Sequence, residues 1–540
     1  MSYPDPPNQP SWGAPPGPPG GQYPPPQPGA VYASPPSAPR RSNRMWMVPV
    51  AAGLGVVMMA GTVWAATSVA QNVFVGAQPE SVLPASSIAF AKLDLQPNGG
   101  QLAAYAQFVN RLPDSMREDI DPEAEPGKEL VDSYIEEAEL DGITYEEHFE
   151  PWMGQRFGAA TWIAGSEDAA SSHAGEAVAL AVEADDEGAA EESLSEIQSQ
   201  LDTDPAFDMR DGFAVITENA AALSDLESQI SSGGTLDEND TYTRDMEAIG
   251  TENLASAWMD LEQFAALGAE SSGGTGSGGL DGYGGVQQPD PLESLGEYED
   301  VSGRAAIALR IEPEYMELRG DMFDVSVDGA GFSDYELPDP GLQMMGDLPD
   351  DTMIAFSGTG VSDLLGQAYE DNPDDFGDLD QMMSELGLTM PDGLTSLLGE
   401  STAVGITDLG GSLDQFANGM SGMPSLQYRA EGADSAAVED AVQRMWEGSY
   451  DSPPGVSSEG PVTIATSGTT GTGKLGDDPV FKQTMADTGS AHMGMYMDLR
   501  PIAESADEDS PEQWGALGAS VGFDDKAMSM QARWAPDGNA

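Results

Sequence analysis

Residues 348–356 read Leu-Pro-Asp-Asp-Thr-Met-Ile-Ala-Phe, and a stretch of the same kind, Leu-Pro-Ala-Ser-Ser-Ile-Ala-Phe, occupies residues 83–90. In each stretch a proline turn is followed by apolar residues that favour a strand. We align the two with one residue inserted in the later stretch. The match indicates that the chain repeats itself.

Three further pairs of segments follow in the same order: residues 152–159 with 397–404, residues 240–261 with 478–499, and residues 308–319 with 520–531. Both members of the last pair read as β-hairpins. Each pair is weak by itself, but four pairs in one order predict a twofold repeat.

Between these blocks the apolar residues take helical spacing, as in Leu102, Tyr105, Ala106, Val109 and Leu112. Strands and helices in separate blocks predict an α+β fold. We therefore expect a duplicated ectodomain of two similar units, each with helices on one face of a largely antiparallel sheet. The expected repeats cover residues 81–326 and 347–534.

A second feature is the stretch Trp46–Ala70, which holds 25 residues without a charged side chain. A helix of this length reaches about 37 Å, more than the roughly 30 Å of bilayer hydrocarbon. We expect a transmembrane helix over residues 46–70. A cleaved signal peptide is the alternative, because Ser68-Val69-Ala70 offers small residues to a signal peptidase.

The tail before this stretch, residues 1–44, is rich in proline and should be disordered and extended. It ends in Arg40, Arg41 and Arg44, so the positive-inside rule places the tail in the cytoplasm. We predict a single-pass protein of the cell membrane with an extracytoplasmic C-terminal domain.

The charge of the chain is strongly unbalanced, with 20 Lys and Arg against 93 Asp and Glu and a formal net charge of -73. Such a surface repels phosphate groups, so nucleic acid is excluded as a partner. Cysteine is absent, which excludes disulfides and thiolate metal sites.

Several motifs resemble functional sites but lack a required part. Residues 468–475 resemble a phosphate-binding loop, yet Leu475 stands where Ser or Thr would hold Mg²⁺. Residues 518–522 have the letters of a nucleophile elbow, but we expect Ser520 to lie within a strand. The acidic runs 371–378 and 185–188 lack the bidentate Glu of an EF-hand.

Histidine and methionine offer no stronger candidates. The chain has three His, at positions 148, 173 and 492, and none is matched between the repeats. Met493, Met495 and Met497 alternate along an expected strand, where they fill core or form a Met-rich groove for an apolar ligand. We therefore predict no catalytic residue, no cofactor-binding residue, no metal ligand and no cofactor.

With these features in view, the chain resembles the actinobacterial membrane-anchored proteins known as domain of unknown function 3352. The resemblance covers about residues 81–534 and rests on residues 348–352, on Leu397-Leu398-Gly399 and on the repeat layout. Trp152-Met153-Gly154 departs from the Leu-Gly form. The family has no established activity, so the resemblance implies no site residues.

These observations favour a non-enzymatic membrane protein whose acidic domain binds or scaffolds. The expected partners are the membrane, through residues 46–70, and an envelope protein or an apolar ligand. One alternative is a carrier of lipid or another apolar ligand. Another is a hydrolase using paired carboxylates, because 92 acidic groups beyond residue 70 offer many pairs.

Overall fold

The computed structural model describes residues 77–94, 99–118, 128, 131–132, 135, 142–170, 175–201, 204–250, 253–271, 301–327, 330–331, 339–371, 373–411, 424–446, 453–468, 470–506, 508–524 and 527–537. Residues 1–44 and the apolar stretch 46–70 lie outside this part, as does His173.

The first half of the described chain forms β1 (Ser87–Asp94), β2 (Met153–Ile163), β3 (Glu176–Ala184), β4 (Ala206–Arg210), β5 (Phe213–Thr217), β6 (Ala255–Asp260), β7 (Val301–Ile311), β8 (Met316–Val327) and the short β9 (Ala330–Gly331). The main strands pair antiparallel in the order β4-β5-β3-β2-β1-β6-β7-β8.

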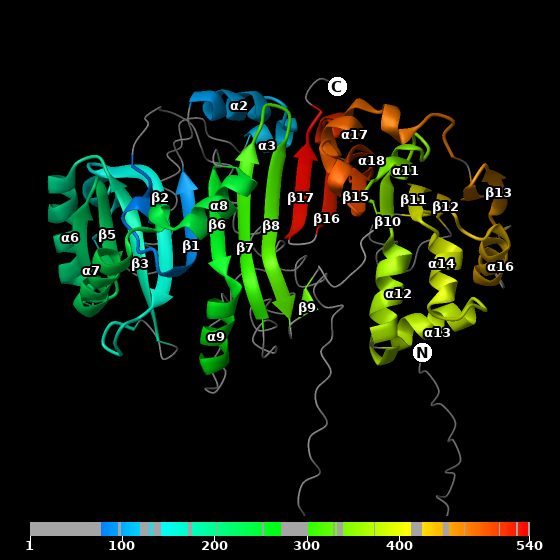
Figure 1. Cartoon of the computed structure of the whole chain (residues 1–540). Helices are drawn as coiled ribbons and strands as arrows, with labels where there is room; N and C mark the ends of the chain where they lie inside the picture. Colours follow the sequence, from blue (N-terminus) through cyan, green and yellow to red (C-terminus); the bar gives the residue numbers. More distant parts are fainter. Residues whose placement is uncertain are drawn as a thin grey trace, which may run out of the picture. The chain divides into compact units, whose positions relative to one another are not determined.

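The second half forms β10 (Ile354–Thr359), β11 (Ser401–Asp408), β12 (Ser425–Glu431), β13 (Gly455–Glu459), β14 (Val462–Ser467), β15 (Met493–Asp498), β16 (Ala516–Phe523) and β17 (Ala527–Ala535). Their antiparallel order is β13-β14-β12-β11-β10-β15-β16-β17. Element by element, this order follows the order of the first half. β8 then pairs with β17, so both sets of strands belong to one sheet (Figure 1).

The predicted fold class of two separate units behind a transmembrane helix is wrong. β8 of the first half pairs with β17 of the second half, so no free edge separates two sheets. The membrane and single-pass assignments also lack support, because no helix among the described residues is long and apolar enough to cross a membrane.

Helices pack on both faces of the sheet, whereas the sequence predicted one covered face. The described helices are α2 (Gly99–Val109), α3 (Asp114–Glu118), α5 (Tyr145–His148), α6 (Glu187–Gln200), α7 (Ala220–Gly233), α8 (Asp240–Ile249), α9 (Leu261–Ser271), α11 (Gln343–Gly346), α12 (Val361–Asp371), α13 (Gly377–Glu385), α14 (Asp392–Leu398), α16 (Ser435–Met445), α17 (Pro479–Thr484) and α18 (Arg500–Ser505). The helix predicted over Leu102 to Leu112 is confirmed as α2, which ends at Val109, before Leu112.

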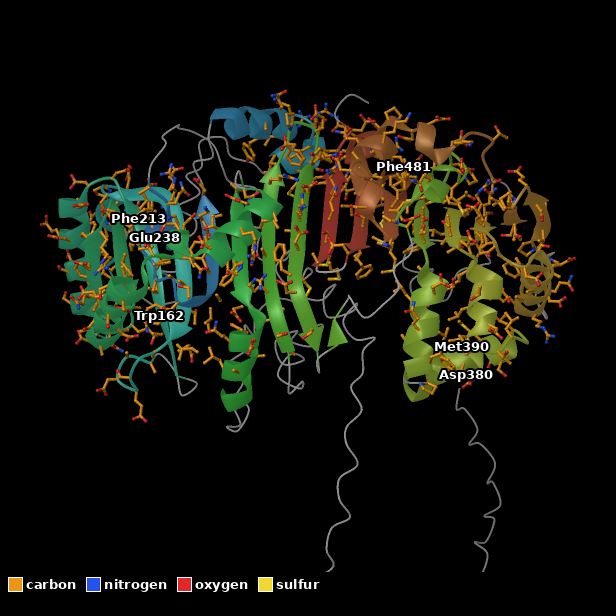
Figure 2. All side chains as sticks on the ribbon, viewed as in Figure 1. Trp162, Phe213, Glu238, Asp380, Met390 and Phe481 are labelled. Carbon is orange, nitrogen blue, oxygen red and sulfur yellow. The ribbon has the colours of Figure 1, made fainter. Side chains whose placement is uncertain are left out.

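The two faces differ in chemistry, and we name them by it. The arginine face carries Arg156, Arg310, Arg319 and Arg533 and packs against α7, α8 and α17. Trp162 and Phe213, marked in Figure 2, lie in the cluster that α7 covers on this face. The apolar face carries the alternate residues of each strand, because side chains of a strand point to opposite faces in turn.

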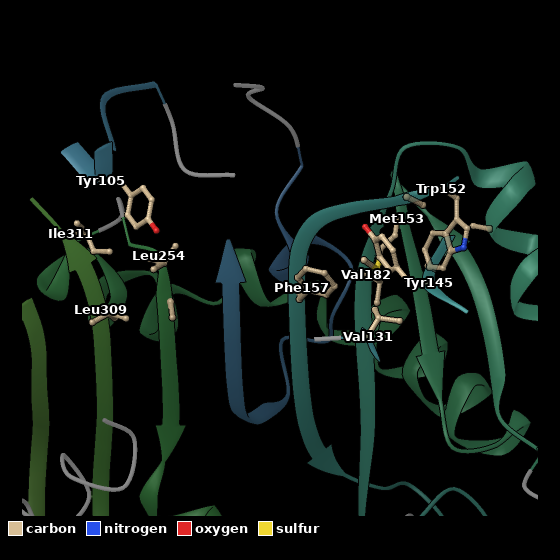
Figure 3. Packing of buried hydrophobic residues seen from close by; sticks show 14 of the residues in the cluster. Tyr105, Val131, Tyr145, Trp152, Met153, Phe157, Val182, Leu254, Leu309 and Ile311 are labelled. Carbon is tan, nitrogen blue, oxygen red and sulfur yellow. The ribbon is translucent and has the colours of Figure 1, made fainter. Parts of the chain in front are cut away.

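Helices cover the apolar face only in part. In the first half α2 and α6 bury one cluster on it, in which Tyr105 lies beside Leu309 and Ile311 (Figure 3). Trp152, Tyr145 and Met153 pack together near Val182 in the same cluster. α9 covers a second cluster through Leu261. In the second half, α14 and α16 cover Tyr428 and Ala465 on β12 and β14.

The structure corrects the predicted alignment of the two strand openers. Ser87 Oγ donates a hydrogen bond to the carbonyl of Pro84 at 2.7 Å, and Thr352 Oγ1 donates one to that of Pro349, also at 2.7 Å. These equivalent turns align the two stretches without an insertion. Phe356 therefore corresponds to Ala91 rather than to Phe90, and it lies on the opposite face from Phe90.

Candidate functional site

Phe356 is at the centre of an apolar surface on the second half of the sheet. It pairs with Val404 on β11 and with Met495 on β15. Met495 in turn pairs with Ala519 on β16, and the row continues across β17 to Leu318 on β8. In the next row Met497 pairs with Leu517. We call Phe356, Val404, Met495, Met497 and Leu517 the Phe356 surface.

The Phe356 surface is open to solvent. Phe356 is 49% exposed and Leu517 is 38% exposed, although both lie on interior strands of the sheet. Val404, Met495 and Met497 are half-buried. Monomeric proteins rarely leave contiguous large apolar side chains open unless the surface binds something.

The exposed large hydrophobic residues of the described strands share one side of the sheet. These are Ile163, Leu180, Phe356 and Leu517. The strand pairing links Leu180 through Ala159 to Ala91, and it links Leu517 through Met497 to Ile354, all on the apolar face. The exposure is therefore a property of this face and is not scattered over the surface.

The first half has a much smaller surface at the equivalent place. Ala91 pairs with Ala159 and Ala257, as Phe356 pairs with Val404 and Met495. Ala91 is exposed, as Phe356 is. The two halves thus share a backbone arrangement but present three alanines in one case and large apolar side chains in the other.

Positive charge is absent from the strands of the Phe356 surface. The arginines on the described strands of the second half are Arg429 and Arg533, and both lie on the arginine face. Asp408, which is exposed, ends β11 two residues beyond Ile406. A ligand at the Phe356 surface would therefore meet apolar side chains and no arginine or lysine of these strands.

The arginine face holds a buried ion network where β8 meets β17. Glu317 is 1% exposed and accepts hydrogen bonds from Arg533 Nε at 2.9 Å and from Arg310 Nε at 2.7 Å. Arg533 also donates to the carbonyls of Gln483 and Ala486, both at 3.2 Å. Its guanidinium lies 4.0 Å from the ring centroid of Tyr315. These contacts hold β8 of the first half and β17 of the second half together.

Asp321 lies on β8 in the same region. It pairs with Ser529 across to β17, and its Oδ2 lies 3.3 Å from Arg319 Nη2. Burial raises the pKa of Asp321, although the charge of Arg319 partly opposes the shift. The first half has a further ion pair on this face, between Arg304 and Asp245 at 2.6 Å.

The phosphate-loop candidate, residues 468–475, is placed where it cannot hold a phosphate. Lys474 Nζ lies 2.6 Å from Asp347 Oδ1. The glycines pack so closely on the turn before β10 that a Cβ at Gly473 would collide with the carboxylate of Asp350. The loop therefore adjoins acidic groups, which repel phosphate.

The other sequence candidates are dispersed. Ser520 lies inside β16, paired with Gly494 and Gln531, as the sequence predicted. His148 Nδ1 lies 3.3 Å from the carbonyl of Thr144, and His492 accepts from the backbone N–H of Phe523 at 3.2 Å. In the acidic run 185–188, Asp186 caps α6. Among the described residues, no three His, Asp or Glu side chains are grouped to hold a metal ion.

Sequence reasoning missed the Phe356 surface. It named Met495 and Met497 but treated them first as core, and it used Phe356 and Val404 only as residues of the repeated segments. The signal was present in the alternation of Met493, Met495 and Met497, because alternate residues face one side of a sheet. Which side is covered depends on helices distant in sequence.

Comparison of the chain with protein-family models, with curated proteins and with solved structures finds no match. The resemblance to domain of unknown function 3352 therefore stays a prediction.

Proposed function

We propose that this protein is a non-enzymatic binding protein and that the Phe356 surface is its binding surface. The observation that carries the proposal is the common orientation of the exposed hydrophobic residues on the strands, with Phe356 nearly half exposed in the middle of a sheet. Burying such a side chain against a ligand contributes roughly 1.5–3 kcal/mol when the burial is complete.

The scaffold suits binding. The ion network between β8 and β17 and the antiparallel pairs on both sides hold the surface on regular strands. Sites on rigid elements keep their geometry better than sites on loops. The location of the acidic region outside the cytoplasm stays a prediction, which rests on the arginines at the end of the proline-rich tail.

A carrier of an apolar ligand is the second candidate. The observation that favours it is the pair of half-buried methionines, Met495 and Met497, beside Phe356. Methionine side chains are flexible and adapt to ligands of different shape. Native mass spectrometry of the purified chain would show a co-purified ligand if this candidate is correct.

The hydrolase alternative has less support. The buried carboxylates that bind arginine on the described arginine face are Asp245, Glu317 and Asp321. Arg304 holds Asp245, Arg310 and Arg533 hold Glu317, and Arg319 holds Asp321. Carboxylates in such ion pairs serve to hold strands and helices together in the arrangement described above.

A neutral, environment-sensitive dye such as N-phenylnaphthylamine tests the proposal. We expect the full chain to bind it with increased fluorescence and the variant Phe356→Ser to bind it about tenfold more weakly. Leu180→Ser is the matched control, because it removes an exposed apolar side chain from the same face of the first half. Equal binding by Phe356→Ser and the wild type would contradict the proposal.

A further inference from the structure

We infer that the ligand of the Phe356 surface is a basic amphipathic helix of a partner protein. This inference rests on the proposed function and names the class of partner. The charge of the chain favours a basic partner. Residues 71–540 carry 17 basic and 92 acidic groups, and the second-half strands put both of their arginines on the opposite face. A partner with positive charges around an apolar centre complements both properties.

The arrangement of the apolar side chains matches one side of a helix. Val404, Phe356 and Met495 lie on three adjacent strands, and Leu517 lies on the next strand in the neighbouring row. Neighbouring strands are about 4.8 Å apart, so the surface extends roughly 14 Å from β11 to β16. Two to three helical turns of about 5.4 Å cover this length. An amphipathic helix presents anchors with that spacing along one side.

The methionines make the Phe356 surface adaptable. Met495 and Met497 lie between Phe356 and Leu517 and are half-buried, so they can change rotamer when a helix binds. The equivalent alanines of the first half, Ala91, Ala159 and Ala257, offer no such contact. The inference therefore applies to the second half alone.

Charge also decides against a lipid bilayer as the partner. Membranes with anionic headgroups attract proteins through Lys and Arg, which the second-half strands of this face lack. An acidic surface and an anionic bilayer repel each other. The acidic protein instead attracts the Lys and Arg residues of a basic helix.

The experiment measures binding of three labelled peptides of about 18 residues, or five turns, to the full chain. They share one leucine face and differ in the polar face, which is made of Lys, Gln or Glu. We expect the Lys peptide to bind most tightly and to weaken as salt is added. Phe356→Ser should weaken the Lys peptide about tenfold, whereas Leu180→Ser should leave it unchanged.

Each other outcome has a definite meaning. If the Gln or Glu peptide binds as tightly as the Lys peptide and depends on Phe356, the inference is wrong and the proposed function stands. If the Lys peptide binds equally to the wild type and to Phe356→Ser, its binding is unspecific attraction and the inference is wrong. If the neutral dye also binds equally to the wild type and to Phe356→Ser, the proposed function is wrong as well.

Discussion

The position of a single aromatic side chain separates the two halves of the sheet. Phe90 is 2% exposed on the arginine face, where its ring packs edge-on against Tyr242 at 5.6 Å. Phe356 follows the same Ile-Ala pair in sequence but lies on the apolar face and is half exposed. The difference arises because Phe356 comes one residue later in its strand.

This difference predicts unequal effects of two similar substitutions. Phe90→Ala should lower the free energy of unfolding by about 3–5 kcal/mol, because it leaves a cavity in a packed cluster. Phe356→Ala should cost about 1 kcal/mol or less, because half of its surface is already in water. Urea unfolding of both variants measures the difference, and equal losses would show that the register is misassigned.

Asp321 predicts a pH dependence with a definite sign. Its carboxyl has a raised pKa because burial disfavours the charged form. Below the ordinary Asp pKa of 3.8, the carboxyl is protonated in both the folded and the unfolded states, so its burial does not lower the free energy of unfolding through charge. Between that value and the raised pKa of the folded state, the unfolded chain ionises while the folded protein keeps its proton, so the folded state loses stability until the pH passes its raised pKa.

Asp321→Asn should therefore become more stable relative to the wild type as the pH rises from below 3.8 to neutral. Unfolding free energies of both proteins at several pH values measure this. A difference that stays constant with pH would contradict the assigned burial.

At the scale of elements, the ion network between β7, β8 and β17 should stabilise the junction of the two halves. Glu317→Ala leaves the guanidinium of Arg533 buried without its carboxylate. Removing one partner of a buried pair typically costs about 3–5 kcal/mol. The matched control is Lys474→Ala, which breaks an exposed ion pair with Asp347 and should cost about 1 kcal/mol or less.

Thermal and urea unfolding of both variants give these values. A loss for Glu317→Ala no larger than that for Lys474→Ala would show that the network does not hold the halves together.

Sequence reasoning predicted many of the elements. The hairpins at residues 308–319 and 520–531 are confirmed as β7–β8 and β16–β17, and α2 is confirmed as a helix. It did not name α7, α8 or α9 as helices. Short helices with caps such as Asn219 and Asn239 give a local signal that the repeat pattern concealed.

At the scale of the molecule, two facts could not be read from the chain. Pairing of β8 with β17 joins residues about two hundred positions apart, as in the pair Leu318 and Ala532. Strand edges pair through backbone groups, which all sequences share. No residue pattern therefore predicts which two edge strands pair. The sequence also did not predict helices on both faces. A strand buried on both faces no longer alternates apolar and polar residues, so its sequence does not show which face is covered.

The candidate site depends on the same long-range facts. The sequence showed the alternating methionines and the acidic surface, and both take part in the proposed binding. It did not show that the three large side chains Val404, Phe356 and Met495 stand where the first half has alanines. That comparison needs the pairing of β10 with β11 and β15.

The central claim is that Phe356 lies open on the apolar face and is covered by the ligand. The natural chain has no cysteine, so Phe356→Cys and Ala355→Cys each introduce a single thiol. We expect a thiol reagent to label position 356 quickly and position 355 slowly, since Ala355 is buried. The Lys-faced peptide should slow labelling at 356. Slow labelling at 356 with fast labelling at 355 would contradict the account.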